Sequence, residues 1–250
     1  MASKNEPVPL SEANALPTRD AVAAAASLPV YDATGQSQPF SSLYTPRPSS
    51  SSSSSASRHL IIFVRHFFCG VCLPPPLSPL PVYLHPPRPP DTPQHTALTG
   101  AQNCQDFIRA LSAAITPAAL AALPTRTTLT IIGCGASDLI PMYAHATHCA
   151  FPLFADPDRA IYDALGMTRT LNLGPRKPDY VVGGMVANVL SSVWQGLKQG
   201  AAALKGGDVQ QVGGEFLFDG AGEVTWCHRM RYTRDHTEVE ELKTMLGLSG

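Results

Sequence analysis

The sequence predicts an α/β sandwich in which a mixed central sheet is flanked by helices. Two runs rich in apolar and β-branched residues, 60–64 and 127–132, have the composition of buried strands. Stretches with helical spacing of apolar residues follow both runs, and a hairpin pattern lies near the end of the chain. The 250 residues suffice for one core of about 150 to 190 residues, so we expect one domain.

The first half of the chain contains segments without regular structure between these elements. We expect a disordered tail over 1–24 and a domain over 25–247 that is interrupted twice, by a serine-rich linker at 46–57 and by a disordered proline-rich insert at 71–102. Two short strands lie within 28–43, around a Thr34-Gly35 turn. A helix begins at the N-cap Asn103, and its apolar face is Phe107, Ile108, Leu111 and Ile115.

The second half continues the alternation of strands and helices. The strand at 127–132 ends at Gly133-Cys134-Gly135, a tight turn with either a buried or a site-lining cysteine. The elements expected after it are a helix from Ser137, a short strand at 151–154, a helix from Pro157 to Gly166, a helix at 186–198, a hairpin of 216–218 with 224–226, and a helix at 236–246.

The proline-rich insert divides what otherwise reads as one thiol site. Cys69-Gly70 precedes it and Asn103-Cys104 follows it, so removing 71–102 joins them into a CxxC at a strand-to-helix turn. As written, Cys69 and Cys72 also form a CxxC, and all three cysteines are candidates for the catalytic thiols. Leu73 and the three prolines after it exclude a helix start next to Cys72, which favours Cys69 with Cys104.

The insert has the marks of a translated intron. It contains 10 of the 24 prolines, and its 32 residues correspond to 96 nucleotides, which preserve the reading frame. Codons for Val71-Cys72 can match a splice donor, and those for Ala101-Gln102 can end in the CAG of an acceptor. We therefore interpret 71–102 as a retained intron or a gene-model error, with a genuine proline-rich insertion as the alternative.

Composition limits the classes of partner. With 18 basic and 19 acidic residues the net charge is −1, so we expect neither nucleic acid nor an anionic membrane as a partner. No apolar run approaches the roughly 20 residues of a membrane span. The first residues lack the basic and apolar regions of a signal peptide, and the six unevenly spaced cysteines do not suggest a secreted disulfide scaffold. We expect a cytoplasmic protein.

Several blocks together resemble a known family. They are Phe63-Val-Arg-His-Phe-Phe-Cys-Gly joined to Asn103-Cys-Gln-Asp-Phe, then Ile131-Ile-Gly-Cys-Gly, then Phe151-Pro-Leu-Phe-Ala-Asp-Pro, and the stretch from Trp226 to His236. In these blocks the chain resembles the AhpC/TSA antioxidant-enzyme-domain proteins of the peroxiredoxin-like type. The resemblance implies a thioredoxin-like fold and reduction of a small peroxide or disulfide. It also implies a thioredoxin- or glutathione-type reductant and no bound cofactor.

The expected chemistry rests on a thiolate at the start of a helix. The N–H groups and dipole of a helix beginning at Asn103 favour an anionic Cys69, and Arg65 and His66 can add to this effect. Cys69 would attack the substrate, and Cys104 would resolve the intermediate as an internal disulfide. The alternative is a pair of buried, inert cysteines.

Two departures from true peroxiredoxins weaken peroxide activation. True peroxiredoxins have a threonine three positions before the reactive cysteine, and this chain has His66 at that place. They also have an arginine ahead of the later core strand, and the corresponding position here falls near Gly213. Arg229 or Arg231 could replace that arginine, although a structural ion pair is the ordinary role of such residues. The alternative to an enzyme is therefore a non-catalytic binding or scaffold protein with a thioredoxin fold.

Overall fold

A computed structural model describes residues 9–45, 57–67, 103–176, 178–181 and 206–248. Its strands are β1 (Pro29–Tyr31), β2 (Ser37–Pro39), β3 (Ser57–Phe63), β4 (Arg126–Gly133), β5 (Leu153–Ala155), β6 (Gly214–Asp219) and β7 (Val224–Arg229). Its helices are α1 (Leu10–Ala13), α2 (Arg19–Ala26), α3 (Asn103–Ala114), α4 (Pro117–Ala121), α5 (Ile140–Thr147), α6 (Ala160–Ala164) and α9 (Val239–Leu246), with 3-10 turns η1 (Phe40–Leu43) and η2 (Ser137–Leu139).

The described strands form one mixed sheet in the order β2-β1-β5-β4-β3-β6-β7. β3 pairs in parallel with β4, and β4 with β5, because helices cross over between them. β6 joins the other side of β3 antiparallel, and the β6–β7 hairpin closes that edge. The βαβ unit of β3, α3 and β4 and the ββα unit of β6, β7 and α9 confirm the thioredoxin-like sandwich that the resemblance implies.

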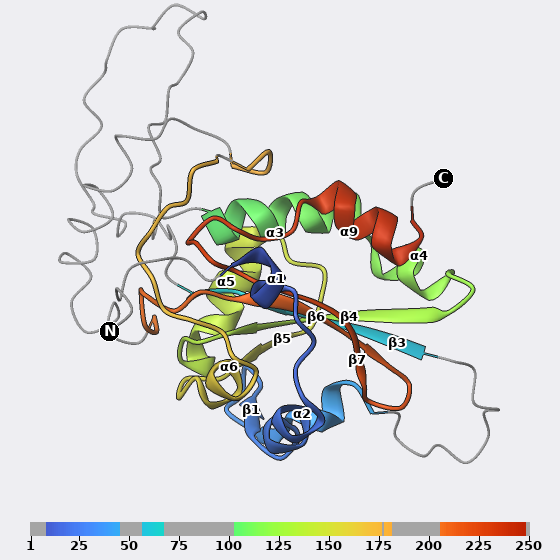
Figure 1. The fold of residues 1–250 in the computed structure, drawn as a ribbon, viewed down its shortest axis with the longest axis horizontal. Helices are drawn as coiled ribbons and strands as arrows, with labels where there is room; N and C mark the ends of the chain where they lie inside the picture. The colour runs from blue at the N-terminus through green and yellow to red at the C-terminus, as the bar shows by residue number, and fades with distance from the viewer. Residues whose placement is uncertain (1–8, 46–56, 68–102, 177, 182–205, 249–250) are drawn as a thin grey trace, which may run out of the picture.

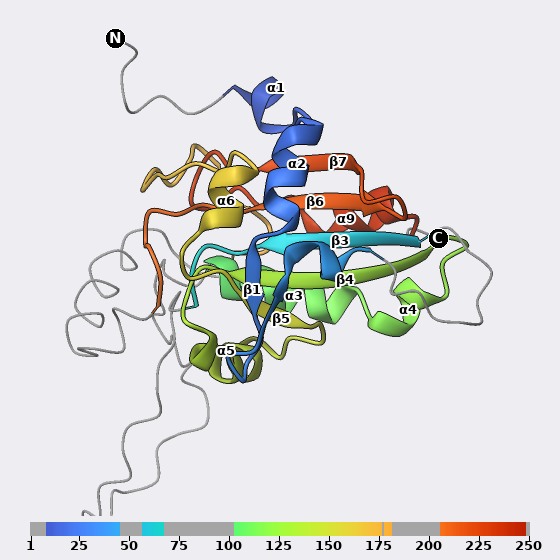
Figure 2. The same cartoon turned by 90° about the horizontal axis from the view of Figure 1, so that it is seen from below.

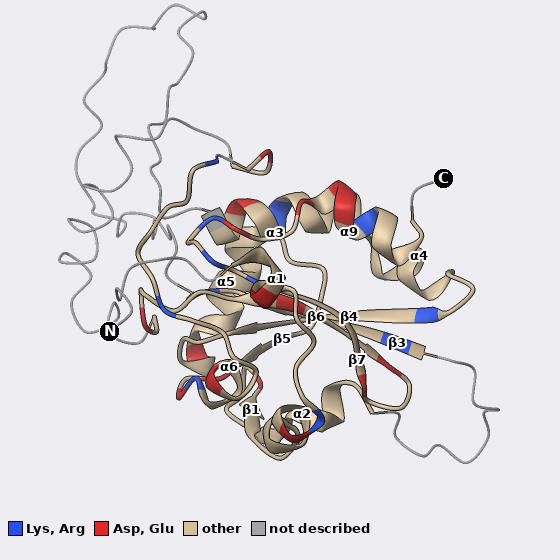
Figure 3. Cartoon of the chain, in the orientation of Figure 1, with Lys and Arg blue, Asp and Glu red and all other residues tan. Residues whose placement is uncertain are grey.

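Helices cover both faces of the sheet (Figures 1 and 2). α3 and α9 lie on one face, and α2 and α6 lie on the other. The predicted apolar face of α3 is confirmed, since Phe107, Ile108, Leu111 and Ile115 are all fully buried. They pack on the side chains of β3 and β4 that point the same way, Leu60, Ile62 and Ile131 among them. Basic and acidic residues are interspersed over the described elements (Figure 3).

The structure differs from the sequence prediction mainly at helix starts. Asp156 accepts hydrogen bonds from the N–H groups of Ala160 and Ile161, and Arg159 takes a left-handed φ of 60°, so α6 begins at Ala160 and not at Pro157. α9 begins at Val239 because Glu238 is extended, with a ψ of 143°. α1 and most of α2 lie in the tail 1–24 that was expected to be disordered, where Ala13 is buried, and α4 is not predicted from the sequence.

Three predictions fall on other residues. The helix expected at 186–198, the insert at 71–102 and residues 46–56 of the serine-rich linker lie outside the described ranges, whereas Ser57 belongs to β3. The domain boundaries stay a prediction for the same reason.

Candidate thiol site

The carboxyl ends of β3 and β4 lie side by side where the thiol site is expected. The N–H of Val64, just after β3, donates to the carbonyl of Ile132 at 2.8 Å. The hydroxyl of Tyr162, from α6, lies 2.7 Å from the Val64 carbonyl and 3.0 Å from that of Ile132. Tyr162 is fully buried, so it holds the two strand ends together from inside the core.

Phe67 continues the chain from β3 and packs over the turn that follows β4. A Cβ atom on Gly133 would lie 2.3 Å from Cε1 of Phe67, and one on Gly135 would lie 2.6 Å from its Cδ2. The two glycines therefore make the space that the Phe67 ring occupies. The Phe67 N–H donates to the carbonyl of Gly206 at 3.2 Å, which attaches this segment to the loop before β6.

Of the predicted catalytic cysteines, the structure places Cys104. Cys69 and Cys72 lie outside the described residues. Cys104 is in the first turn of α3, is fully buried, and belongs to the same apolar cluster as Phe67, which is two positions before Cys69. The pairing of Cys69 with Cys104 stays a prediction.

Arg65 connects the end of β3 to the loop before β6. Its guanidinium is buried and donates to the carbonyls of Val209 and Gln211 at 2.6 and 3.3 Å. His66 beside it is also buried. Arg65 thus positions the loop that adjoins the site, and the role expected for Arg65 and His66 in activating Cys69 stays a prediction.

The other described cysteines are poor nucleophiles. The Cys134 thiol donates to the Arg65 carbonyl at 2.6 Å, and burial raises its pKa to about 12. Burial also raises the pKa of Cys149 and of Cys227. Because the thiolate is the reactive form, Cys134 acts as a packed hydrogen-bond donor in a tight turn, which is the first of the two roles considered from its sequence.

The position of the family's arginine has no room for a side chain. A Cβ atom on Gly213 would lie 1.7 Å from the carbonyl oxygen of Phe63. Arg229 and Arg231 have structural partners instead. Arg229 donates to the Leu165 and Ala15 carbonyls, each at 2.6 Å, and Arg231 pairs with Asp235 at 3.2 Å.

Sequence reasoning missed a buried polar cluster next to α3. Nδ1 of His236 lies 2.5 Å from Oε1 of Glu215, and the Thr237 hydroxyl donates to Oε2 of Glu215 at 3.2 Å. The backbone N–H of His236 donates to the Tyr180 hydroxyl at 3.2 Å. Glu215 occupies a strand position in an otherwise apolar run, and that position was the one available signal.

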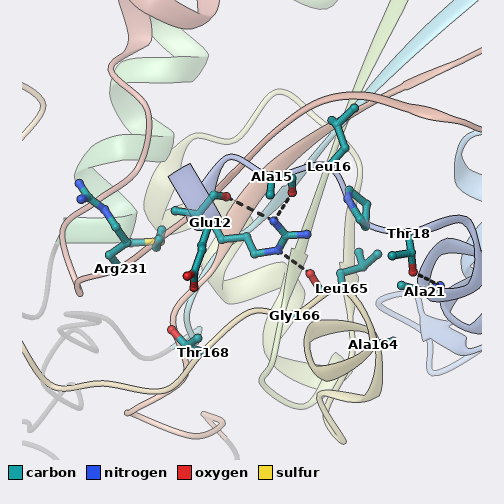
Figure 4. A pocket seen from close by; sticks show the side chains of 14 residues that line it. Glu12, Ala15, Leu16, Thr18, Ala21, Ala164, Leu165, Gly166, Thr168 and Arg231 are labelled. Atoms are coloured by element: carbon teal, nitrogen blue, oxygen red, sulfur yellow. Dashed lines mark hydrogen bonds between the residues drawn. The ribbon is translucent and has the colours of Figure 1, made fainter. Parts of the chain in front are cut away.

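A cavity of about 410 Å³ lies elsewhere in the described part of the molecule (Figure 4). It is bounded by the segment 12–18 on one side and by Ala164 to Thr168 on the other, with Arg231 at its edge. None of its lining residues comes from the ends of β3 and β4. The cavity is therefore distinct from the candidate thiol site.

The part of the chain that the structure describes has neither a metal-ligand cluster nor a long apolar helix. No group of three or more His, Cys, Asp or Glu side chains is arranged to hold a metal ion there. None of the helices described is long and apolar enough to cross a membrane.

Comparisons with known proteins agree with the resemblance seen in the sequence. A family model described as AhpC/TSA antioxidant enzyme matches residues 111–232, a stretch that begins after Cys104. Peroxiredoxin-like 2C of Homo sapiens is 23% identical over 227 residues, which cover 90% of this chain and 80% of the relative. Peroxiredoxin-like 2C of Takifugu rubripes is 24% identical over 221 residues, covering 88% and 78%.

Among solved structures, Peroxiredoxin Q of Xanthomonas campestris matches with a TM-score of 0.46 and 13% identity, covering 94% of this chain and 96% of that one.

The sheet order and its two structural units define a thioredoxin-like fold. Among proteins of this fold, the chain is similar to the AhpC/TSA antioxidant enzymes over 111–232 and to the Peroxiredoxin-like 2C relatives over most of its length. These similarities and the fold together support a function of the thiol oxidoreductase type.

Proposed function

We propose that this protein reduces peroxides or disulfides through Cys69 and Cys104. The observation that carries the proposal is the placement of Cys104, which is buried in the first turn of α3 within the cluster that contains Phe67. Phe67 leads directly into the segment that carries Cys69. A cysteine before a helix and another in its first turn have the arrangement of a redox dithiol.

The reaction balances with an external reductant. The Cys69 thiolate attacks one oxygen of a peroxide, the O–O bond breaks, and an alcohol or water leaves after taking a proton. Cys104 then attacks the sulfenic acid of Cys69, which forms the disulfide and releases water. One thioredoxin-type dithiol or two molecules of a glutathione-type thiol reduce the disulfide and restore both cysteines, and the reducing conditions of a cytoplasmic location suit this cycle.

The test measures peroxide consumption coupled to a thioredoxin system. We expect activity in a form that lacks 71–102, its loss in Cys69→Ser of that form, and little activity in the full chain. In the full chain 34 residues separate Cys69 from Cys104, and prolines follow Cys72, so the thiols lose the geometry that the shorter connection provides. Equal activity in both forms would contradict the role assigned to the insert.

A non-catalytic thioredoxin-fold protein is the second candidate, and Gly213 favours it. The backbone there excludes the arginine that true peroxiredoxins carry, and His66 stands where they have threonine. Under this alternative, neither form consumes peroxide or reduces a disulfide substrate, although both fold.

The origin of the insert is tested on the transcript. We expect the dominant mRNA to lack the 96 nucleotides that encode 71–102. A dominant transcript that contains them would refute the intron interpretation and favour a genuine proline-rich insertion.

A further inference from the structure

Glu215 and His236 form a buried carboxylate–imidazole pair. The side chain of His236 is 1% exposed and that of Glu215 is fully buried. Glu215 faces the α3 side of the sheet, because it pairs with Ile62 of β3, whose side chain belongs to the core on that side. Taking a carboxylate out of water is costly, so a pair in this position needs a compensating interaction or a function.

The second ring nitrogen of His236 has no hydrogen-bond partner among the described residues. Another buried histidine of the same region, His228, has partners at both nitrogens, with Asn14 at 2.8 Å and the Asp235 carbonyl at 2.7 Å. Because Glu215 holds Nδ1, a neutral His236 carries its proton there and leaves Nε2 as a proton acceptor. That arrangement is the one a buried general base requires.

His236 lies against the helix turn that carries Cys104. Its ring stacks on Phe107 with centroids 4.2 Å apart and planes 2° from parallel. Phe107 is three positions after Cys104, so the two side chains share one face of α3. Tyr180 packs edge-on against Phe107. Burial is the main cause that raises the pKa of Tyr180, and the charges of Cys104 and Glu215 raise it further.

We propose that the Glu215–His236 pair accepts the proton of the Cys104 thiol during the resolving step. The inference rests on the proposed function, because Cys69 must first become a sulfenic acid. The Cys104 proton moves to Nε2 of His236, the Cys104 sulfur attacks the Cys69 sulfur, and the S–O bond of Cys69 breaks. The departing hydroxide takes the proton from the imidazolium and leaves as water, so one sulfur is oxidised as the other is reduced.

The titratable groups near the His236 imidazole are Glu215 from β6, Cys104 from α3, Tyr180, and Glu238, which follows Thr237. Glu215 stabilises the imidazolium that forms when the thiol loses its proton, as the carboxylate of a catalytic triad does for its histidine. The Tyr180 hydroxyl is a donor available to a thiolate, since it accepts only the His236 N–H among its described bonds.

The first test measures ionisation of Cys104 in the full chain, without any turnover. The Cβ shift of 13C-labelled Cys104, assigned with Cys104→Ser, is followed from pH 6 to pH 10 together with the His236 imidazole. His236→Asn keeps a donor toward Glu215 but lacks the acceptor nitrogen, and we expect its Cys104 thiolate fraction at pH 7.5 to fall about tenfold or more. His228→Asn is the matched control and should leave that fraction unchanged.

Equal thiolate fractions in wild type and in folded His236→Asn would overturn the proposal. If His236→Asn does not fold, Glu215→Gln keeps an acceptor for Nδ1–H but removes the charge, and the same fall is expected there. In the wild type alone, a titration step shared by Cys104 and His236 supports the coupling, and independent titrations refute it.

The second test follows one equivalent of hydrogen peroxide added to the form that lacks 71–102, the form in which the proposed function expects activity. We expect His236→Asn to slow formation of the Cys69–Cys104 disulfide by about 100-fold, with sulfenic acid formation at Cys69 unchanged. An unchanged rate of disulfide formation would contradict the proposal. Absence of any sulfenic acid in the wild type would refute the proposed function instead, and the titration would still decide the coupling.

Discussion

At the residue scale, Gly213 shows how closely β6 approaches the end of β3. Its missing Cβ would lie 1.7 Å from the Phe63 carbonyl oxygen, which is a backbone atom that cannot turn aside. We expect Gly213→Ala to lower the free energy of unfolding by about 3 kcal/mol or more, because the strands must separate to admit the methyl group. Gly220→Ala is the control, since its nearest contact would be an ordinary 3.4 Å.

Urea denaturation of both variants measures the difference. A Gly213→Ala protein as stable as the Gly220→Ala protein would show that the two strands separate more easily than their register indicates.

Asp156 gives a prediction about pH at the same scale. Burial raises its pKa to about 6, although the N–H groups of α6 oppose that shift. Its folded-state pKa is above the unfolded value, so its contribution to stability is full below the unfolded pKa and is lost as pH rises through about 6. Relative to Asp156→Asn, which still caps α6, wild type should lose about 2 kcal/mol between pH 4 and pH 7.5.

Urea midpoints of wild type and Asp156→Asn at the two pH values test this loss. A stability difference between them that stays constant with pH would contradict it.

Residue-scale prediction from the sequence succeeded where spacing alone determines burial. The face of α3 and the glycine-flanked Cys134 turn follow from local periodicity and turn chemistry. The Glu215–His236 pair could not be predicted, because its partners are 21 positions apart and meet only when the β6–β7 hairpin and the start of α9 have folded. Cys104 was singled out by its residue type and its position at the start of α3, and its catalytic role, like that of Cys69, stays a prediction.

At the element scale, side chains of β7 hold the N-terminal segment onto the edge of the sheet. Arg229 donates to the Ala15 and Ala13 carbonyls at 2.6 and 3.3 Å, and His228 bonds Asn14. The segment thereby covers part of an edge strand. We expect Arg229→Met to cost about 1 to 3 kcal/mol and to speed amide exchange in α1.

The rate of amide hydrogen exchange at Ala13 and Asn14 measures whether α1 separates from β7 in Arg229→Met. Arg19→Met is the control, because the Arg19 side chain is 87% exposed and its ion pair with Glu223 is 3.5 Å long, so its loss should leave exchange in α1 unchanged. Slow exchange in Arg229→Met would mean that the remaining contacts of α1 suffice to hold it.

The elements that sequence reasoning placed correctly are those with strong periodic patterns. β3, β4, α3 and the β6–β7 hairpin carry long apolar or alternating runs, whereas α1 and α4 have only four and five residues and little pattern to detect. α6 and α9 begin later in the chain than predicted. The Asp156 side chain caps α6, and Glu238 is extended, so neither helix includes the first turn that was expected. Such caps depend on tertiary contacts that a linear pattern does not contain.

At the scale of the whole molecule, the alternation of strands and helices was enough to predict the sandwich, because parallel strands need crossover helices. The strand order could not be predicted in the same way, since β6 pairs with β3 although it lies more than 140 residues further along the chain. The insert lies between β3 and α3, within the crossover that builds the thiol site. We therefore expect the insert to affect both the stability of the fold and the geometry of the two cysteines.

Deleting 71–102 should stabilise the protein by shortening that crossover. The connection between Cys69 and Cys104 falls from 34 residues to 2, and loop-closure entropy then favours the folded state by about 2 to 3 kcal/mol. Deleting the seven serines 49–55 is the matched control, because shortening the connection from η1 to β3 from about 13 to 6 residues contributes only about 0.7 kcal/mol. Urea denaturation of the three proteins compares these free energies. A full chain as stable as the form without 71–102 would mean that the insert makes stabilising contacts of its own, and the interpretation of 71–102 as a translated intron would lose its physical support.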